Sequence, residues 1–151
     1  MYFNQEIILF HRSAADCASA LKLLAGEFLK KRLVTNRFLE GILEREKKYP
    51  TGLNVNGLGI AIPHTDSDKV VISQLGFMSL TKPVKFKEMG SDTGTVDVSM
   101  IFMLGLKNAK DQLNMLQRLM ALFQNEQLVG QLQTCDRMDN FIEMMRQAGI
   151  K

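Results

Sequence analysis

The stretch YPTGLNVNGLGIAIPHTDSDK, residues 49–69, decides the fold of this chain and carries its candidate reactive side chain. The turn signal PTG at 50–52 opens it, and a short apolar run, IAI at 60–62, leads to Pro63. Proline has no N–H to donate and fixes its own φ, so a regular strand cannot continue past it. The sequence therefore predicts a short buried strand that ends at Pro63 and presents His64 at the edge of a sheet.

On its N-terminal side, this stretch follows one strand pattern and two helix patterns. Residues 6–12, EIILFHR, are apolar at their centre and predict a strand. Apolar residues then recur at helical spacing over about 14–32, and again up to residue 48. The candidate cap residues are Ser13 or Asp16 for the first helix and Thr35 or Asn36 for the second.

On its C-terminal side, three strand patterns precede three helix patterns. The strands are expected at 70–80, 84–87 and 96–106, with a turn at 81–83 and a polar loop at 88–95. The last strand, VDVSMIFMLGL, is the most apolar and is expected to be central. Helices are expected from Asp111, over 126–133, and from a cap at Asp136 to residue 147. The pattern predicts an α/β fold, a single mixed β-sheet of about five strands flanked by helices on both faces.

Length and composition narrow the class of protein. The 151 residues fit one domain, 46% of them are hydrophobic, and the net charge of +3 is too small to indicate nucleic-acid binding. Cys17 and Cys135 lack the spacing of a metal or redox motif, so we expect reduced, buried thiols in a cytoplasmic protein. No apolar run approaches the roughly 20 residues of a membrane helix, and the N-terminus does not resemble a signal peptide.

Several standard sites are absent from the sequence. There is no GxxxxGK[ST] and no GxGxxG between a strand and a helix, so no nucleotide cofactor is expected. The two histidines and two cysteines do not provide the spacing of a zinc site, and we expect no metal. The acidic residues Asp66, Asp68, Asp92 and Asp97 are interpreted as solvated turn residues.

Two side chains have both a structural and a functional interpretation. A lone histidine beside an apolar run is more often structural than reactive, and this holds for His64 when spacing alone is considered. Arg45 has the fork geometry that binds a phosphate, but its spacing equally allows a surface ion pair with a neighbouring glutamate on the same helix. His11 lies within a strand pattern with no partner for chemistry nearby, so we interpret it as structural.

Two motifs carry a family resemblance. GIAIPH, residues 59–64, resembles the active-site motif of the fructose/mannitol superfamily of enzyme IIA proteins of the bacterial phosphoenolpyruvate-dependent sugar phosphotransferase system. LEREKKYPTG, residues 43–52, is similar to the matching helix end and Thr-Gly turn of that family. The combination of YPTG and AIPH most resembles the galactitol-type branch. The resemblance covers nearly the whole chain and implies that 1–151 is a single EIIA type-2 domain.

The resemblance implies a role for four residues. His64 matches the histidine that accepts a phosphoryl group from the histidine-containing phosphocarrier protein HPr and passes it to a cysteine of a sugar-specific enzyme IIB. Arg45 matches an active-site arginine of the mannitol branch. Gln112 stands where that branch has a second active-site histidine, and an amide can donate to a phosphate but cannot carry a proton. Thr65 departs from the small residue common after the histidine, and it serves either as a phosphate donor or as a turn or cap residue.

The resemblance also implies partners and leaves the biological role open. Ile62, Pro63 and residues around Met89 are expected to form an apolar surface for HPr and enzyme IIB, and the membrane is reached only through the permease subunit IIC. A transport phosphocarrier and a regulatory phosphohistidine domain would share the same site. A binding module without chemistry is a third class, against which the intact AIPH motif argues.

Overall fold

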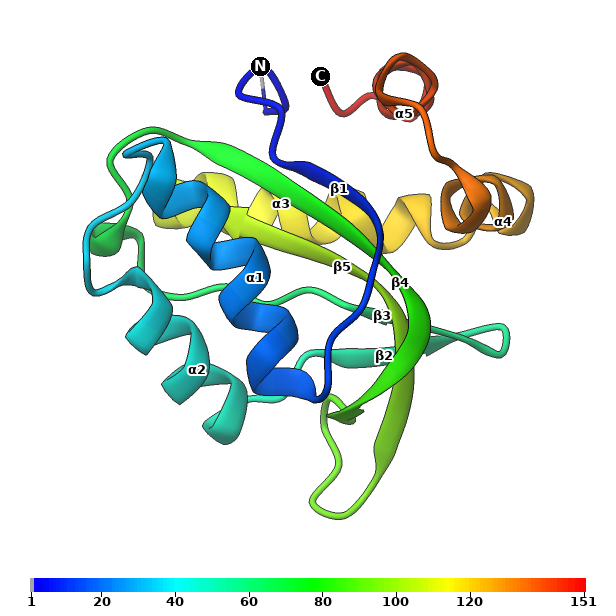
Figure 1. Cartoon of the computed structure of the whole chain (residues 1–151), viewed down its shortest axis with the longest axis horizontal. Helices are drawn as coiled ribbons and strands as arrows, with labels where there is room; N and C mark the ends of the chain where they lie inside the picture. Colours follow the sequence, from blue (N-terminus) through cyan, green and yellow to red (C-terminus); the bar gives the residue numbers. More distant parts are fainter. Residues whose placement is uncertain (1) are drawn as a thin grey trace.

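The apolar run before Pro63 forms a strand inside a five-stranded mixed sheet, in the computed structural model of residues 2–151 (Figure 1). The strand order is β1-β4-β5-β3-β2. The strands are β1 (Ile8–Arg12), β2 (Gly52–Val55), β3 (Leu58–Ala61), β4 (Gln74–Lys87) and β5 (Thr95–Gly105). β1 is parallel to β4 and β3 is parallel to β5, whereas the β4–β5 and β2–β3 pairs are antiparallel. The predicted mixed sheet is confirmed, and β5 occupies its predicted central place.

Helices cover both faces of the sheet (Figure 1). The helices are α1 (Cys17–Lys30), α2 (Phe38–Lys48), α3 (Ala109–Leu122), α4 (Glu126–Thr134) and α5 (Met138–Gln147), with a short 3₁₀ turn η1 at Ser67–Lys69. Helices α1 and α2 pack on one face, and α3, α4 and α5 pack on the other. Neighbouring β5 side chains serve opposite cores, since Phe102 contacts the α3–α5 side and Ile101 the α1–α2 side. Both cores therefore depend on the alternation of side chains along one central strand.

The helix starts agree with the predicted caps in part. Asp16 caps α1, because its Oδ1 accepts a hydrogen bond from the Ser19 N–H at 2.8 Å. Helix α3 begins two residues before the predicted Asp111, since Asn108 accepts from the N–H groups of Lys110 and Asp111. The predicted cap at Asp136 is wrong: α5 starts one residue later, after Arg137, which provides no side-chain cap bond.

The β2–β3 hairpin was not predicted from the sequence. Gly52, assigned to a turn, is instead the first residue of β2 and pairs with Ala61. The connecting residues Asn56 and Gly57 both have positive φ, 54° and 87°. Asparagine and glycine are the two residues that adopt this conformation most readily, which is why they form two-residue hairpin turns.

Strand β4 corrects a second prediction. The expected turn at 81–83 does not interrupt the chain, which continues as one strand from Gln74 to Lys87 with a register irregularity between Ser79 and Val84. Pairing with β1 ends where Arg12 lies opposite Leu80, and within residues 2–151 no other strand pairs with that edge of β4 beyond this point. Pro83, which has no N–H to donate, is tolerated on this unpaired edge because no neighbouring strand needs a donor there. Residues 70–73 precede the strand rather than belonging to it.

The two cysteines have free thiols, and they differ in exposure. Cys135 is buried, whereas Cys17, at the start of α1, is only half-buried. Burial, together with the nearby negative charges of Glu46 and Asp16, raises the pKa of the Cys17 thiol to about 12. Cys17 therefore stays a neutral thiol near neutral pH.

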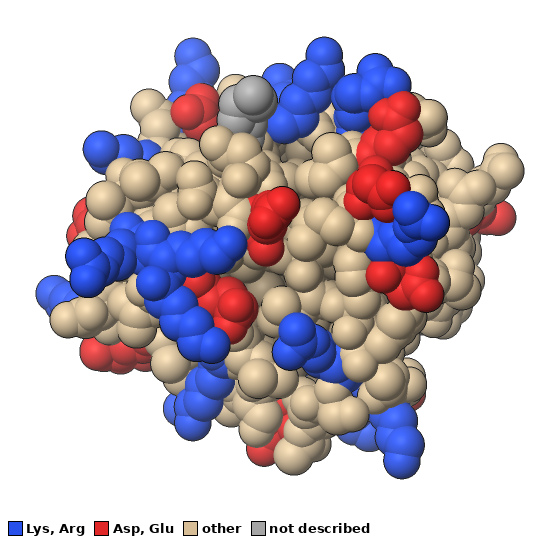
Figure 2. All heavy atoms as spheres, turned by 45° about the horizontal axis from the view of Figure 1, so that its top comes forward, with Lys and Arg blue, Asp and Glu red and all other residues tan. Residues whose placement is uncertain are grey.

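The two terminal segments of the chain are joined by a backbone hydrogen bond. Tyr2 donates its backbone N–H to the Lys151 carbonyl at 3.0 Å, so the N- and C-terminal segments lie side by side (Figure 1). On the face drawn in Figure 2, Lys and Arg side chains are interspersed with Asp and Glu. Within residues 2–151, no helix combines the length and apolar character needed to cross a membrane.

Candidate functional site

His64 is held by backbone bonds on both sides of its strand. The Leu104 N–H of β5 donates to the Pro63 carbonyl at 3.1 Å, and the Ile62 N–H donates to the Thr51 carbonyl at 3.4 Å. The residue immediately before the histidine is therefore fixed to the central strand. A side chain placed by a rigid strand end is held more accurately than one on a free loop.

The imidazole of His64 is half-buried and has one nitrogen engaged. Its Nδ1 lies 2.9 Å from the Ile62 carbonyl oxygen. Because a carbonyl can only accept, Nδ1 carries the hydrogen, and Nε2 keeps its lone pair. Burial lowers the pKa of His64, the Arg45 charge lowers it further, and the bond to Ile62 opposes both effects. The site therefore favours a neutral imidazole whose Nε2 carries a lone pair that could act as a nucleophile.

This environment predicts a defined pH behaviour. We expect an NMR titration to place the pKa of His64 below its ordinary value of 6.5. Between the lowered pKa of the folded state and the ordinary value of 6.5 in the unfolded state, the unfolded chain binds more protons than the folded one. The contribution of His64 to the free energy of unfolding is therefore complete above pH 6.5 and is lost as the pH falls through the folded-state pKa. The measurement is the pH dependence of Tm in wild type and His64→Gln, whose difference should be confined to the acidic side.

An Arg45→Ala protein tests the electrostatic contribution to the lowered pKa of His64. Removing this charge should raise the pKa of His64 while leaving it below its ordinary value, because burial is the larger cause of the shift. A wild-type titration with a pKa above 6.5 would contradict the proposed environment.

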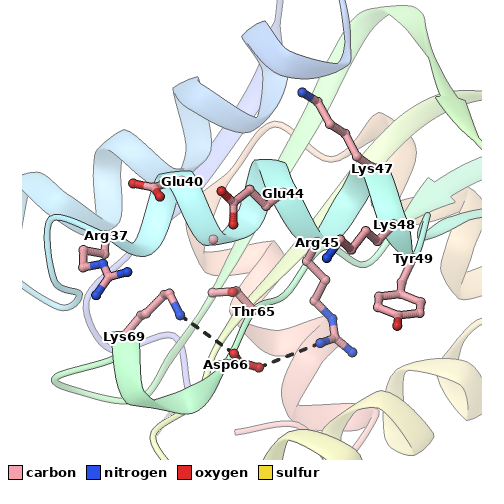
Figure 3. Close-up of a pocket in the computed structure, with 11 residues that line it drawn as sticks. Arg37, Glu40, Glu44, Arg45, Lys47, Lys48, Tyr49, Thr65, Asp66 and Lys69 are labelled. Atoms are coloured by element: carbon pink, nitrogen blue, oxygen red, sulfur yellow. Dashed lines mark ion pairs between the residues drawn. The ribbon is translucent and has the colours of Figure 1, made fainter.

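Arg45 reaches from α2 towards the segment that follows His64 (Figure 3). Its Nη1 lies 3.9 Å from Asp66 Oδ1, and its guanidinium carbon lies 5.3 Å from the centre of the Tyr49 ring. Its Nε is buried and has no hydrogen-bond partner among the described residues. The ion pair with a neighbouring glutamate that the sequence allowed is not formed; within residues 2–151, Asp66 is the ion-pair partner of Arg45.

An open pocket of about 520 Å³ lies between α2 and the segment after His64 (Figure 3). Helix α2 contributes Gly41 and Arg45, and the facing segment contributes Thr65, Asp66 and Lys69. Asp66 lies between two cations, 3.9 Å from Arg45 and 3.8 Å from Lys69 Nζ. A carboxylate of the chain thus lies against cations that also suit a phosphoryl group.

Gln112 and Thr65 contact each other directly. Gln112 lies near the start of α3 and is buried, and its Nε2 donates to the Thr65 carbonyl at 3.1 Å. Its Oε1 has no hydrogen-bond partner in the described part of the chain. Thr65 is only 3% exposed and lies against α2. The structure therefore brings the two residues together one position beyond His64, with one amide hydrogen of Gln112 already engaged.

The residues expected to contact partners differ in exposure. Ile62 is 2% exposed and Pro63 is buried, so both side chains offer almost no surface to a partner. Met89 is 39% exposed, and its N–H donates to the Gly52 carbonyl at 2.9 Å. Sequence reasoning did not single out Leu113, which is 58% exposed and follows Gln112 on α3. It also treated Asp66 as a solvated turn residue and did not consider Gly41.

The fold defines the class of protein to which this chain is similar. The crystal structure of IIA mannitol from Escherichia coli superposes with a TM-score of 0.77 at 22% identity, covering 93% of this chain and 96% of that one. The complex of enzyme IIA mannitol with phosphorylated enzyme IIB mannitol from Escherichia coli gives the same TM-score, 0.77, at 22% identity over 94% of this chain and 95% of that chain. These likenesses establish the IIA fold.

Sequence comparison establishes the family. Residues 1–148 match the family described as phosphoenolpyruvate-dependent sugar phosphotransferase system, EIIA 2. The galactitol-specific EIIA component of Escherichia coli K12 is 30% identical over 129 residues, which span 83% of this chain and 85% of that protein. The chain belongs to the EIIA type-2 family of the sugar phosphotransferase system and is a phosphotransferase component, as its motifs predicted.

Proposed function

We propose that this protein is the IIA phosphocarrier of a permease for a sugar or sugar alcohol. His64 accepts a phosphoryl group from the phosphohistidine of HPr and passes it to a cysteine of the cognate enzyme IIB. The observation that carries this proposal is the geometry of His64, whose Nδ1 lies 2.9 Å from the Ile62 carbonyl and whose Nε2 is left as the nucleophile.

The transfer balances as two displacements at phosphorus. In the first, the Nε2 lone pair of His64 forms a bond to phosphorus while the phosphorus–nitrogen bond of HPr breaks and its electron pair returns to the HPr imidazole. In the second, an enzyme IIB thiolate attacks phosphorus and the pair of the breaking bond returns to Nε2. Such transfers need positioning and charge stabilisation more than covalent chemistry.

The neighbours of His64 can supply both requirements. The imidazole becomes cationic when Nε2 is phosphorylated, and the Ile62 carbonyl that accepts from Nδ1 stabilises that charge. Arg45 has a guanidinium to place against the phosphoryl oxygens, and Asp66 has to yield the contact that it makes with Arg45 at 3.9 Å. In this proposal Thr65 and Gln112 support the phosphate site, Gln112 mainly by fixing the Thr65 backbone.

The relatives favour transport over regulation. Both relatives from Escherichia coli are named galactitol-specific EIIA components, and neither name refers to regulation. We therefore propose a galactitol-type permease, with the protein in the cytoplasm and linked to the membrane only through its IIC subunit.

The proposed partner surface includes Met89, which is 39% exposed, and Leu113, which is 58% exposed. Exposed apolar side chains suit a carrier that must bind weakly and leave. Addition of HPr should shift the backbone NMR signals around these two residues. Signals that shift only elsewhere would show that the partner surface has been misplaced.

The decisive experiment reconstitutes the relay. The protein is incubated with phosphoenolpyruvate, enzyme I and HPr, and then with enzyme IIB of galactitol and, as a matched control, of mannitol. We expect phosphoryl uptake in the first step and faster transfer to the galactitol partner in the second. Uptake without transfer to any IIB would favour the regulatory role, and no uptake from HPr would contradict the phosphocarrier function.

A further inference from the structure

Gly41 occupies an unusual place for a glycine, the interior of helix α2. Glycine is among the least favourable residues inside a helix, so a buried glycine there calls for a reason in the packing. Gly41 precedes Arg45 by four residues, which places the two on the same side of the helix. That side faces Thr65, Asp66 and Lys69, which line the same pocket (Figure 3).

The space beside Gly41 is filled by the segment that follows His64. A β-carbon at position 41 would lie 2.5 Å from Thr65 Oγ1 and 2.8 Å from Lys69 Cδ. A β-carbon does not approach an oxygen or another carbon atom that closely, so one of these neighbours would have to be displaced. The Lys69 side chain is long and flexible, whereas Thr65 is short and only 3% exposed, so it has little space into which to move.

Thr65 is held from two directions. Its side chain lies against Gly41 of α2, and its carbonyl accepts from Gln112 Nε2 of α3 at 3.1 Å. A displacement on the α2 side would therefore act on the backbone next to His64, because the Thr65 carbonyl is bonded to α3 on its other side. The spacing between the helix that carries Arg45 and the strand end that carries His64 depends on this contact.

Other helical glycines lack such a contact. Gly26 in α1 and Gly130 in α4 would place a β-carbon with nothing within 4 Å. Alanine at either position changes the helix interior in the same way without moving a neighbour. These two positions separate the effect of helix propensity from the effect of the close approach.

We propose that Gly41 is a positioning residue for phosphoryl transfer, whose missing side chain sets the distance between Arg45 and His64. This inference rests on the proposed function, since it assigns Gly41 a part in the same transfer. Errors of about 1 Å in the placement of reacting groups reduce rates by up to about 100-fold. Gly41→Ala should slow uptake from phosphorylated HPr by roughly tenfold or more.

The experiment compares Gly41→Ala with Gly26→Ala and Gly130→Ala. All three should fold, and only Gly41→Ala should transfer slowly, with a reduced maximal rate and an unchanged half-saturating HPr concentration. Without HPr, its backbone amide signals at 64–66 should shift relative to wild type, which the control variants should not show. Wild-type transfer rates in a folded Gly41→Ala protein would overturn the inference, as would equal slowing in the controls.

Thr65→Ala completes a double-mutant cycle. Without Oγ1 the close contact with Thr65 disappears and only the flexible Lys69 side chain still has to shift. Gly41→Ala/Thr65→Ala should therefore transfer at the rate of Thr65→Ala alone. If the double variant is slower than Thr65→Ala by the same factor that separates Gly41→Ala from wild type, the contact is not the cause. This arm also decides the matter if Gly41→Ala alone fails to fold. Absence of uptake by the wild-type protein would instead contradict the phosphocarrier function, and the amide shifts would still report on the contact.

Discussion

Replacing His64 with alanine is expected to abolish uptake of the phosphoryl group from phosphorylated HPr. The substitution removes Nε2, the proposed nucleophile, together with the Nδ1 contact to the Ile62 carbonyl that orients the ring. Intact-mass measurement should show one added phosphoryl group on the wild-type protein and none on His64→Ala. The wild-type adduct should be lost in acid, because phosphohistidine is acid-labile.

His11 provides the matched control. It is the other of the two histidines in the sequence and lies exposed in β1, where its backbone N–H donates to Ser79 Oγ at 2.8 Å. A His11→Ala protein should be phosphorylated like wild type. Phosphoryl uptake by His64→Ala, or a label located at His11, would show that the site has been assigned to the wrong residue.

Arg45→Ala is expected to slow phosphoryl transfer by roughly two orders of magnitude, with the fold intact. Removing a donor aimed at a developing anion costs on the order of 2–4 kcal/mol in the transition state, and each 1.36 kcal/mol is about a tenfold change in rate. The side chain is 37% exposed, so its loss should leave the core intact. Single-turnover transfer from phosphorylated HPr measures the effect directly.

Arg37→Ala is the control for the charge of the pocket as a whole. Arg37 lines the same pocket at the start of α2, so a general electrostatic effect would appear in both variants. A specific contact between Arg45 and the phosphate should appear only in Arg45→Ala. Unchanged transfer in Arg45→Ala would mean that its pairing with Asp66 is a surface ion pair and that backbone N–H groups hold the phosphate.

Gln112 substitutions test the other side of the site. Gln112→Ala should slow transfer less than Arg45→Ala, because a neutral amide contributes less than a guanidinium and one of its hydrogens already binds the Thr65 carbonyl. Gln112→His, which introduces the mannitol-type residue, should transfer near or above the starting rate if the position faces the phosphate. Wild-type transfer rates in every Gln112 variant would show that this residue does not contribute to the site.

Much of the fold was predictable because local signals agreed with the packing. Strand β3 ends at Ala61, shortly before Pro63, as expected from the loss of a donor, and β5 is central as its apolar run indicated. The β2–β3 hairpin was missed because the turn was assigned to residues 50–52, whereas Asn56-Gly57, a strong hairpin signal, was not interpreted as a turn. The turn expected at 81–83 was wrong because a proline also fits a free strand edge.

The candidate site was predictable only where a motif names the residue. The GIAIPH motif indicated His64, but the partner of Arg45 lies 21 residues away in Asp66, and no local spacing relates them. The Gly41 contact is likewise tertiary, since it involves Thr65 and Lys69 from beyond the β2–β3 hairpin. A glycine inside an otherwise strong helix pattern was the one available signal, and it gives no indication of which segment approaches it.

The two ends of the chain lie side by side, so the order of the helices and strands along the chain can be changed without changing their arrangement in the fold. Because the Tyr2 N–H and the Lys151 carbonyl are 3.0 Å apart, a short linker is enough to close the backbone into a ring. The ring can be reopened between Asn56 and Gly57, both exposed at the hairpin tip and at the opposite end of β3 from His64. Circular permutation is tolerated best at such tips. A permuted chain would bring its new ends far from the pocket, so a reporter fused there would leave Arg45 and His64 undisturbed.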